Sequence, residues 1–284
     1  MKISVLFLFV VLSPATAFLS PRASPRVSVA QFAYSGTNSR VNVATSTNNP
    51  PPTVAKRPEA RRAKELWEST VPVIIHGSSL RTWSFANPNV ARVQILLRTE
   101  GRPMHANIDL WHGPDNTPQK VALYIEDGAL RPFHAYVETP RSPNAVAVYN
   151  TGQLEFPLAA VVEADILTEP LPNLVIGNSP RVIQGGALHT YPFDPTVQSV
   201  AVLLKTDGRP LNARIELLQG PNNNKQVMEV YSEDGLERPF YVVLETPGSG
   251  NVIRIVNTAT MEFPLTAYLE PVVVDSTYPP GRFW

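Results

Sequence analysis

Residues 124–133 read YIEDGALRPF, and residues 231–240 read YSEDGLERPF. The second stretch begins 107 residues after the first, and the same offset relates residues 101–160 to residues 208–267 without a gap. A repeat of this length is a whole domain, because solenoid units are much shorter. The chain is therefore expected to contain two copies of one module, and the features that both copies keep are expected to serve the module itself.

Short turn motifs are what the two copies share most clearly. Gly-Arg-Pro, Glu-Asp-Gly and an Arg that precedes Pro-Phe occur in each copy. In the first copy these residues are Gly101, Arg102, Pro103, Glu126, Asp127, Gly128 and Arg131. In the second copy they are Gly208, Arg209, Pro210, Glu233, Asp234, Gly235 and Arg238. We expect the glycine of Glu-Asp-Gly to provide a positive φ in a hairpin turn. We expect the arginine of Gly-Arg-Pro to hold a turn carbonyl or carboxylate.

Apolar residues between these turns alternate with other residues. Ala106, Ile108 and Leu110 fall on one face of a strand, and Val121, Leu123 and Ile125 repeat the pattern. Segments of period two, separated by Gly, Pro and Asn, predict β-strands, about seven or eight in each copy. The fold class is therefore all-β, with two tandem β-sandwich-like modules in a pseudo-symmetric pair. Their expected boundaries are residues 71–167 and 174–272, with a short proline-bearing linker between them.

The motif Glu-Phe-Pro-Leu occurs at 155–158 and again at 262–265. Proline cannot donate a hydrogen bond to a strand ladder, so this segment predicts a sheet edge or a bulge. Another chain can add to a sheet edge. Phe156, Pro157, Phe263 and Pro264 are therefore candidate assembly residues.

The N-terminal sequence is typical of targeting segments. Residues 1–17 have a short basic start, an apolar run and the cleavage pattern Ala15-Thr16-Ala17, which together predict a signal peptide. Residues 18–55 contain arginine, serine and no acidic residue, as transit peptides do. With Phe18 at the cleavage site, the order resembles the bipartite plastid presequence of diatoms and related algae. Ordinary secretion with a disordered N-terminus is the alternative.

Residues 56–70 have a different pattern, in which apolar residues recur at helical spacing between basic ones. This predicts a short helix, either docked on the first module or binding a partner through Trp67. The remainder of the chain carries no long apolar run, so no membrane span is expected in the mature protein. Removal of the presequence leaves a slightly acidic chain, which argues against nucleic acid as a partner.

Catalytic and cofactor chemistry is sparse. The chain has no cysteine and five histidines, and no histidine occurs at the same position in both copies. We therefore expect no catalytic residue, no metal site and no cofactor. The repeated Glu-Asp pair could act as a catalytic couple or a calcium site, but a capped hairpin turn is the simpler interpretation. Exposed aromatic residues leave a carbohydrate- or protein-binding module as the alternative function.

The presequence and the repeated motifs together resemble the diatom pyrenoid shell proteins. The resemblance covers both modules, through Tyr124–Phe133 and Tyr231–Phe240 and the two Glu-Phe-Pro-Leu segments. It implies a non-enzymatic protein in the plastid stroma that polymerises with itself into a sheet at the pyrenoid periphery. It further implies that the sheet encloses the Rubisco condensate and supports CO₂ fixation. Rubisco or pyrenoid matrix proteins are the expected further partners.

Residues 273–284 form a tail beyond the second module. The tail contains two adjacent prolines, and the aromatic residues Phe283 and Trp284 follow them. Aromatic residues of this kind suit a pocket on a neighbouring subunit, so both are candidate assembly residues. The alternative is that the tail folds back onto the second module.

Overall fold

The computed structural model describes residues 58–165 and 180–275. All of these residues belong to one compact unit, Pro50–Trp284. The targeting residues Ala15, Ala17 and Phe18, the expected linker and the tail residues Phe283 and Trp284 lie outside the described residues.

One helix and eight strands make up the first repeat. The elements are α1 (Pro58–Ser69), β1 (Val73–Ile75), β2 (Leu80–Phe85), β3 (Arg92–Arg98), β4 (Met104–His112), β5 (Gln119–Ile125), β6 (Phe133–Glu138), β7 (Asn144–Asn150) and β8 (Leu158–Asp165). The helix occupies the segment whose apolar residues recur at helical spacing, and Pro58 stands at its first turn, where a missing N–H costs no hydrogen bond.

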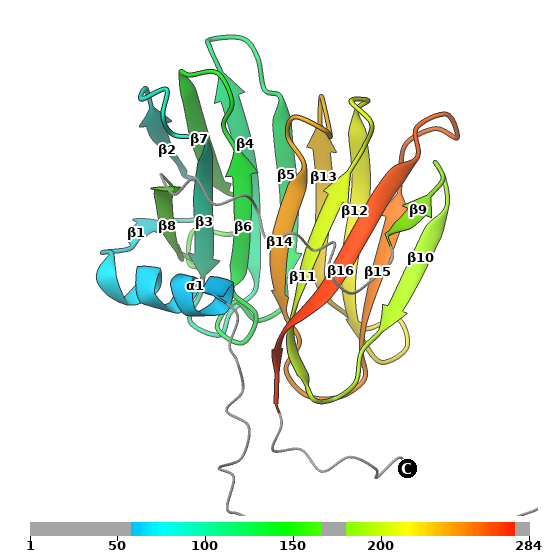
Figure 1. Ribbon diagram of the computed structural model, residues 1–284. Coiled ribbons are helices and arrows are strands. Elements are labelled where there is room, and N and C mark those ends of the chain that lie inside the picture. The colour runs from blue at the N-terminus through cyan, green and yellow to red at the C-terminus, as the bar shows by residue number, and fades with distance from the viewer. Residues whose placement is uncertain (1–57, 166–179, 276–284) are drawn as a thin grey trace, which may run out of the picture. The chain divides into compact units, whose positions relative to one another are not determined.

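Eight further strands make up the second repeat. They are β9 (Arg181–Ile183), β10 (Leu188–Pro192), β11 (Val197–Lys205), β12 (Leu211–Gln219), β13 (Asn224–Ser232), β14 (Phe240–Glu245), β15 (Asn251–Asn257) and β16 (Leu265–Val274). The all-β fold class is confirmed (Figure 1).

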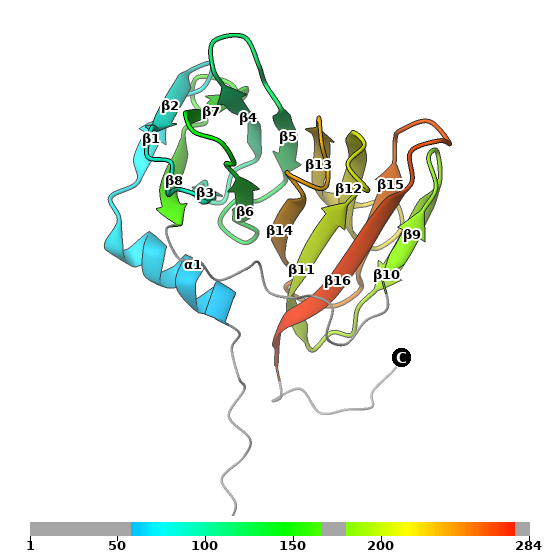
Figure 2. The same cartoon turned by 45° about the horizontal axis from the view of Figure 1, so that its top comes forward.

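The sixteen strands form two eight-stranded sheets. The first sheet has the order β1-β8-β3-β6-β14-β11-β16-β9, and the second has the order β10-β15-β12-β13-β5-β4-β7-β2. Each repeat contributes four strands to each sheet, so both sheets run without interruption from one repeat into the other. Figure 2 shows the two places where the repeats meet, β6 beside β14 and β5 beside β13.

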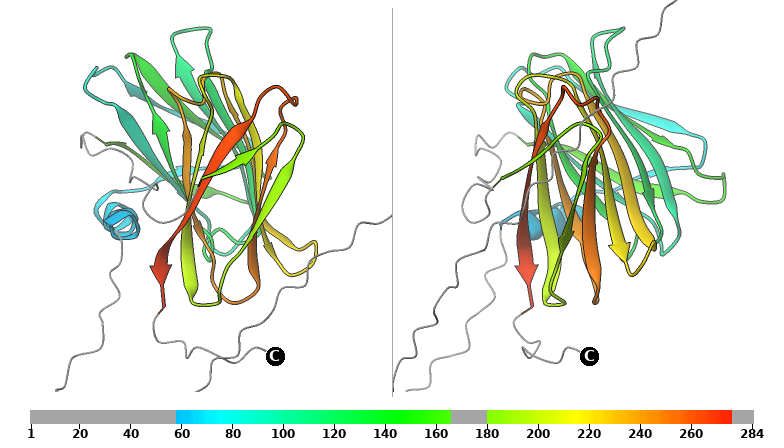
Figure 3. Two further views of the ribbon diagram at one scale, coloured as in Figure 1. Left: turned by 45° about the vertical axis from the view of Figure 1, so that its right-hand side comes forward. Right: turned by 90° about the vertical axis from the view of Figure 1, so that its right-hand side faces the viewer.

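The two sheets pack face to face, and Figure 3 shows the two layers from the side. Strands β4 and β5 alternate as period two predicts, and Ala106, Ile108 and Leu110 are at most 3% exposed. The inward-facing residues of β4 and β5 belong to one apolar cluster. This cluster contains residues of both repeats, among them Val202 and Ile255. Because a one-residue slip would turn each inward set outward, this cluster holds the register of both sheets.

The pairing between the repeats has a definite register. Ala122 of β5 lies opposite Glu229 of β13, and Ala135 of β6 lies opposite Val242 of β14. In each pair, the two residues are 107 positions apart in the sequence, which is the offset of the repeat. This register is compatible with a two-fold axis that relates the two repeats. Pseudo-symmetry of the complete pair stays a prediction.

The prediction that Glu-Phe-Pro-Leu lies at a sheet edge or bears a bulge is wrong. β8 begins at Leu158 and β16 begins at Leu265, so Pro157 and Pro264 precede the ladder and disrupt no strand. β8 lies between β1 and β3, and β16 lies between β11 and β9. Pro271 lies inside β16 and pairs with β11 beyond the three residues that β9 covers. Its missing N–H therefore faces an edge that β9 leaves open.

The expectation of a positive φ at Gly128 and Gly235 is also wrong. The positive φ angles in these turn regions belong to other glycines, among them Gly101 at 73° and Gly208 at 101°. At Gly128 a Cβ would collide with Thr99 Oγ1, and at Gly235 it would meet Thr206 Oγ1 at 2.5 Å. Glycine is required at both positions because the preceding turn lies too close to leave room for a Cβ atom. A positive φ is not the reason.

Candidate functional site

The Glu-Asp-Gly turns lie where the two repeats meet. The backbone N–H of Glu126 donates to the carbonyl of Lys225 at 2.9 Å, and the N–H of Glu233 donates to the carbonyl of Pro118 at 2.8 Å. Pro118 and Lys225 are again 107 residues apart, so the two hydrogen bonds are reciprocal. An ion pair of 2.6 Å between Lys225 Nζ and Glu126 Oε2 adds to the first contact. Both turns therefore join the repeats as well as ending their strands.

The aspartates of these turns cap the residues that follow them. Asp127 Oδ1 accepts hydrogen bonds from the N–H groups of Ala129 and Leu130 at 2.9 and 3.0 Å. Asp234 Oδ1 does the same for Leu236 and Glu237 at 2.8 and 3.0 Å. Each carboxylate satisfies two turn donors, as Asx turns do. This geometry supports a structural role for the Glu-Asp pair rather than a metal-binding one.

The arginine after each turn is buried at the junction between the repeats. Arg131 is 3% exposed, and its Nη2 donates to Gln219 Oε1 in the second repeat at 2.9 Å. Burial lowers the pKa of the Arg131 guanidinium, and the nearby Glu126 and Asp127 carboxylates oppose that shift. Arg238 is also 3% exposed, but it donates to its neighbour Glu237 at 3.0 Å. The two equivalent arginines therefore have different partners.

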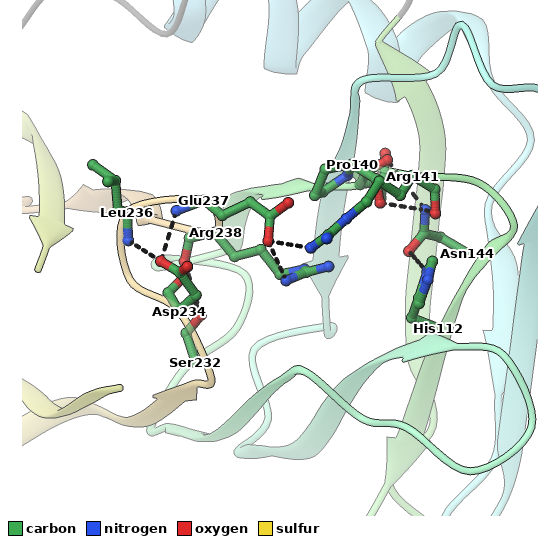
Figure 4. Close-up of polar contacts among 10 residues, drawn as sticks. His112, Pro140, Arg141, Asn144, Ser232, Asp234, Leu236, Glu237 and Arg238 are labelled. Atoms are coloured by element: carbon green, nitrogen blue, oxygen red, sulfur yellow. Dashed lines mark hydrogen bonds and ion pairs between the residues drawn. The ribbon is translucent and has the colours of Figure 1, made fainter. Parts of the chain in front are cut away.

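Glu237 connects the repeats through a second arginine. Arg141 of the first repeat forms an ion pair with Glu237 Oε2, the oxygen that Arg238 also approaches (Figure 4). Arg141 has a φ of 58°, and the equivalent Gly248 of the second repeat has a φ of 81°. A non-glycine residue in this conformation costs on the order of 1 kcal/mol. The first repeat thus carries a strained arginine at the point where its side chain reaches the second repeat.

Each Gly-Arg-Pro arginine holds the Glu-Phe-Pro-Leu segment of its own repeat. Arg102 Nη1 donates to the carbonyl of Glu155 at 3.5 Å, and its guanidinium lies 5.6 Å from the centre of the Phe156 ring. Arg209 donates to the carbonyl of Glu262 at 2.5 Å and lies 5.7 Å from the ring of Phe263. Phe156 and Phe263 are half-buried beneath these guanidinium groups. The candidate assembly phenylalanines therefore belong to an internal contact in each repeat.

Two buried asparagines were not singled out in the sequence. Asn150 Nδ2 donates to the carbonyls of Ile75 and Phe156 at 3.0 and 2.8 Å. Asn257 Nδ2 donates to the carbonyls of Ile183 and Phe263 at 2.9 and 2.8 Å. Both side chains are 1% exposed, and each ties a short outer strand to the Glu-Phe-Pro-Leu segment. Their identity in both repeats was the signal that could have revealed them.

A groove of about 650 Å³ lies beside the first of these arginine contacts. Its lining includes Trp67 from α1, Ile74 from β1, Arg98 from β3, and Arg102, Glu155 and Pro157 from the loops. The Arg98 guanidinium lies 5.9 Å from the centre of the Trp67 ring. We call this site the Trp67 groove. It combines apolar walls with two guanidinium groups at its rim.

A buried histidine, His134, and a half-buried glutamate, Glu245, line a neighbouring cavity of about 290 Å³ beneath α1. Burial lowers the pKa of His134 to about 4, and burial raises the pKa of Glu245 to about 7. Nε2 of His134 lies 2.8 Å from Nε2 of Gln94, so the amide donates to an unprotonated ring nitrogen. Both shifts arise from removal of water.

Exposed apolar side chains occur at the outer strands of both sheets. Ile74 of β1 is 50% exposed and Val182 of β9 is 56% exposed, at opposite ends of the first sheet. Leu80 of β2 is 46% exposed and Leu188 of β10 is 57% exposed, at opposite ends of the second sheet. These are equivalent positions of the two repeats, so both ends of each sheet present the same kind of surface.

Metal and membrane sites were sought within residues 58–165 and 180–275. No group of three or more His, Asp or Glu side chains there could hold a metal ion. No helix in the same ranges is long and apolar enough to cross a membrane.

Comparison with known proteins gives a family and no informative structural relative. The exported protein XepA of PBSX matches at 9% identity over 70% of this chain and 85% of its own, with a TM-score of 0.23. The vicilin from Solanum melongena matches at 7% identity over 66% of this chain and 73% of its own, with a TM-score of 0.18. Likenesses this low support no argument about function. No curated protein matches the chain.

The family model that matches the chain is that of the diatom pyrenoid shell proteins, over residues 67–271. The match begins at Trp67 in α1 and extends to Pro271 in β16, so it includes all the turns, both arginine contacts and the junction between the repeats. Such a family implies a structural shell role in the pyrenoid of the plastid and points to association with copies of the same chain. On this match, the chain belongs to the diatom pyrenoid shell protein family.

Proposed function

We propose that the protein polymerises with itself into a sheet, one protein thick, around the Rubisco-containing pyrenoid in the plastid stroma. The sheet supports CO₂ fixation by keeping the enclosed Rubisco together and by limiting the escape of CO₂. Rubisco and other proteins of the pyrenoid matrix are the proposed partners of its inner surface. The role is structural, and no reaction is assigned to the chain.

One observation carries the self-assembly proposal: both sheets end in short outer strands with exposed apolar side chains. β1 and β9 have three residues each, and they leave β8 and β16 without a described neighbour beyond those residues. Open strand edges are templates for pairing with another chain, and proteins that avoid assembly usually place charges there. Here the outer strands expose Ile74, Val182, Leu80 and Leu188, and their charged residues are Arg81 in β2 and Arg181 in β9.

Negative-stain microscopy of the purified chain starting at Lys56 tests the proposal. We expect sheets or tubes to form without any added ligand. Ile74→Lys combined with Val182→Lys should shift the protein to small soluble species, because lysine at an edge strand opposes pairing. Met261→Lys is the matched control, since Met261 is 80% exposed but lies in a turn outside these strands. A wild-type chain that stays monomeric at every concentration and salt condition would overturn the proposal.

A further inference from the structure

The Trp67 groove is lined in part by residues that the second repeat does not reproduce. Its Trp67 wall comes from α1, which precedes the first repeat, and the residues described from 180 onward contain no counterpart of this helix. At equivalent positions the second repeat has Lys205 in place of Arg98 and Leu236 in place of Ala129. The small Ala129 lines the groove, and leucine there would occupy part of its volume. The two repeats therefore share the strands and turns around this position, and the first repeat differs from the second in the residues that form the groove.

The lining chemistry suits an aromatic side chain next to a cation. Trp67 and Pro157 offer flat apolar surfaces, and Ile74 is 50% exposed at the wall. Arg98 and Arg102 can lie over the face of an added ring, where a guanidinium is attracted to the π-electrons. Glu100 and Glu155 also line the groove, and neither carboxylate has an ion-pair partner within the described ranges. A ligand with aromatic rings and one positive charge would satisfy all of these groups.

A segment of this same chain has that composition. Residues 276–284 read STYPPGRFW, with Arg282 directly before Phe283 and Trp284. The segment contains no acidic residue that Glu100 or Glu155 would repel. Two prolines restrict its conformation, which lowers the entropy lost when it binds.

We propose that the Trp67 groove binds Phe283 and Trp284 of a second copy of the chain, with Arg282 paired to Glu100 or Glu155. This inference rests on the proposed self-assembly and names a contact through which it occurs. Each chain then carries one groove and one aromatic tail. A contact of this heterologous kind leaves one groove and one tail free in each pair of chains, and it continues into an open array when its rotation does not close a ring.

Binding of a labelled peptide tests the groove directly. The probe is fluorescein-labelled STYPPGRFW, and the receptor is the chain starting at Lys56 with Phe283→Ser and Trp284→Ser, which removes the competing tail. Fluorescence anisotropy should show saturable binding. A peptide with alanine in place of both aromatic residues should bind at least about 10-fold more weakly.

Ala129→Leu in the receptor is the decisive variant. Because the second repeat carries Leu236 at this position, leucine is compatible with the turn, and the melting temperature should stay near that of the parent. We expect the peptide to bind at least about 10-fold more weakly. Leu236→Ala in the second repeat is the matched control and should leave binding unchanged. Equal binding with and without Ala129→Leu, or no binding to either, would overturn the proposed groove.

Mixing two defective chains tests whether the tail comes from a second copy. One chain carries Ala129→Leu and Trp67→Ala and keeps its tail, and the other carries Phe283→Ser and Trp284→Ser and keeps its groove. Sedimentation velocity should show a one-to-one complex that neither chain forms alone. If the peptide binds but the mixture contains no complex, the tail of a whole chain does not reach the groove of a second copy, and the proposal is wrong.

Microscopy of the wild-type chain keeps this inference separate from the proposed function. Sheets formed by a chain whose groove binds no peptide would leave self-assembly standing and remove the groove from it. If the groove binds the peptide but the wild-type chain never polymerises, the groove contact stands and the proposed sheet is wrong.

Discussion

Arg131 of the first repeat donates a hydrogen bond of 2.9 Å to Gln219 of the second repeat, and Arg131 as a whole is only 3% exposed. A buried charged donor loses far more when its partner is removed than it gains when the bond forms. Gln219→Leu should therefore lower the free energy of unfolding by about 2–3 kcal/mol. Urea denaturation of soluble protein at pH 7 measures the change.

A double-mutant cycle with Arg131→Met isolates this bond. We expect a coupling energy of about 1.5–3 kcal/mol between the two sites. His112 is the residue of the first repeat that matches Gln219 in sequence, and it contacts Asn144 at 3.2 Å within its own repeat. His112→Leu should therefore show little coupling to Arg131→Met. Simple additivity of Gln219→Leu and Arg131→Met would show that the bond does not hold the repeats together.

The buried asparagines should stabilise the outer strands separately in each repeat. Asn150→Ala removes two donors to buried carbonyls and the acceptor for the N–H of Gly152, and we expect a loss of about 3 kcal/mol. Hydrogen exchange measured by mass spectrometry should show faster exchange in β1 but not in β9. Asn257→Ala should give the opposite pattern. Asn116→Ala, at an exposed position, is the control and should change neither strand.

His134 and Glu245 should give opposing dependences of stability on pH. Between about pH 4 and 6.5 the unfolded state protonates His134 and the folded state does not, so stability rises with pH. Between about pH 4.5 and 7 the folded state keeps a proton on Glu245 that the unfolded state has lost, so stability falls with pH. In the wild-type protein the two slopes cancel over the range that they share.

Single substitutions should separate these slopes. In Glu245→Gln, the free energy of unfolding should rise by about 2–3 kcal/mol from pH 4 to 6.5, because only the histidine slope remains. In His134→Gln it should fall by a similar amount from pH 4.5 to 7. Urea denaturation across this pH range provides the measurement, and the double variant is the control with neither slope. Identical profiles for the two single variants would contradict the assignment.

Phe18 should decide the destination of the presequence. Residues 1–55 fused to a fluorescent protein are expected to reach the plastid of a diatom. Phe18→Ala should leave the fusion in the surrounding membrane compartment, and Leu19→Ala is the neighbouring control. Fluorescence microscopy distinguishes the two locations. Secretion of the unsubstituted fusion would contradict the plastid prediction.

Local chemistry was enough to predict the class of fold and the position of its turns. Alternation of Val121, Leu123 and Ile125 defines a strand whichever partner it has, because successive side chains point to opposite faces. The repeated asparagines Asn150 and Asn257 were also visible in the sequence, although their buried hydrogen bonds were not. The 107-residue offset marked which residues serve both repeats.

Strand order, in contrast, was decided only by tertiary structure. Period two says which face of a strand is apolar and nothing about its neighbour, so the sequence could not show that β5 pairs with β13 and β6 with β14. For the same reason Glu-Phe-Pro-Leu was predicted at a sheet edge, although β1 covers that edge. Gly128 was predicted to have a positive φ, whereas glycine is required there because a Cβ would collide with Thr99. The Trp67 groove likewise exists only because folding brings α1, β1 and β3 together, and contacts between distant segments depend on the whole chain.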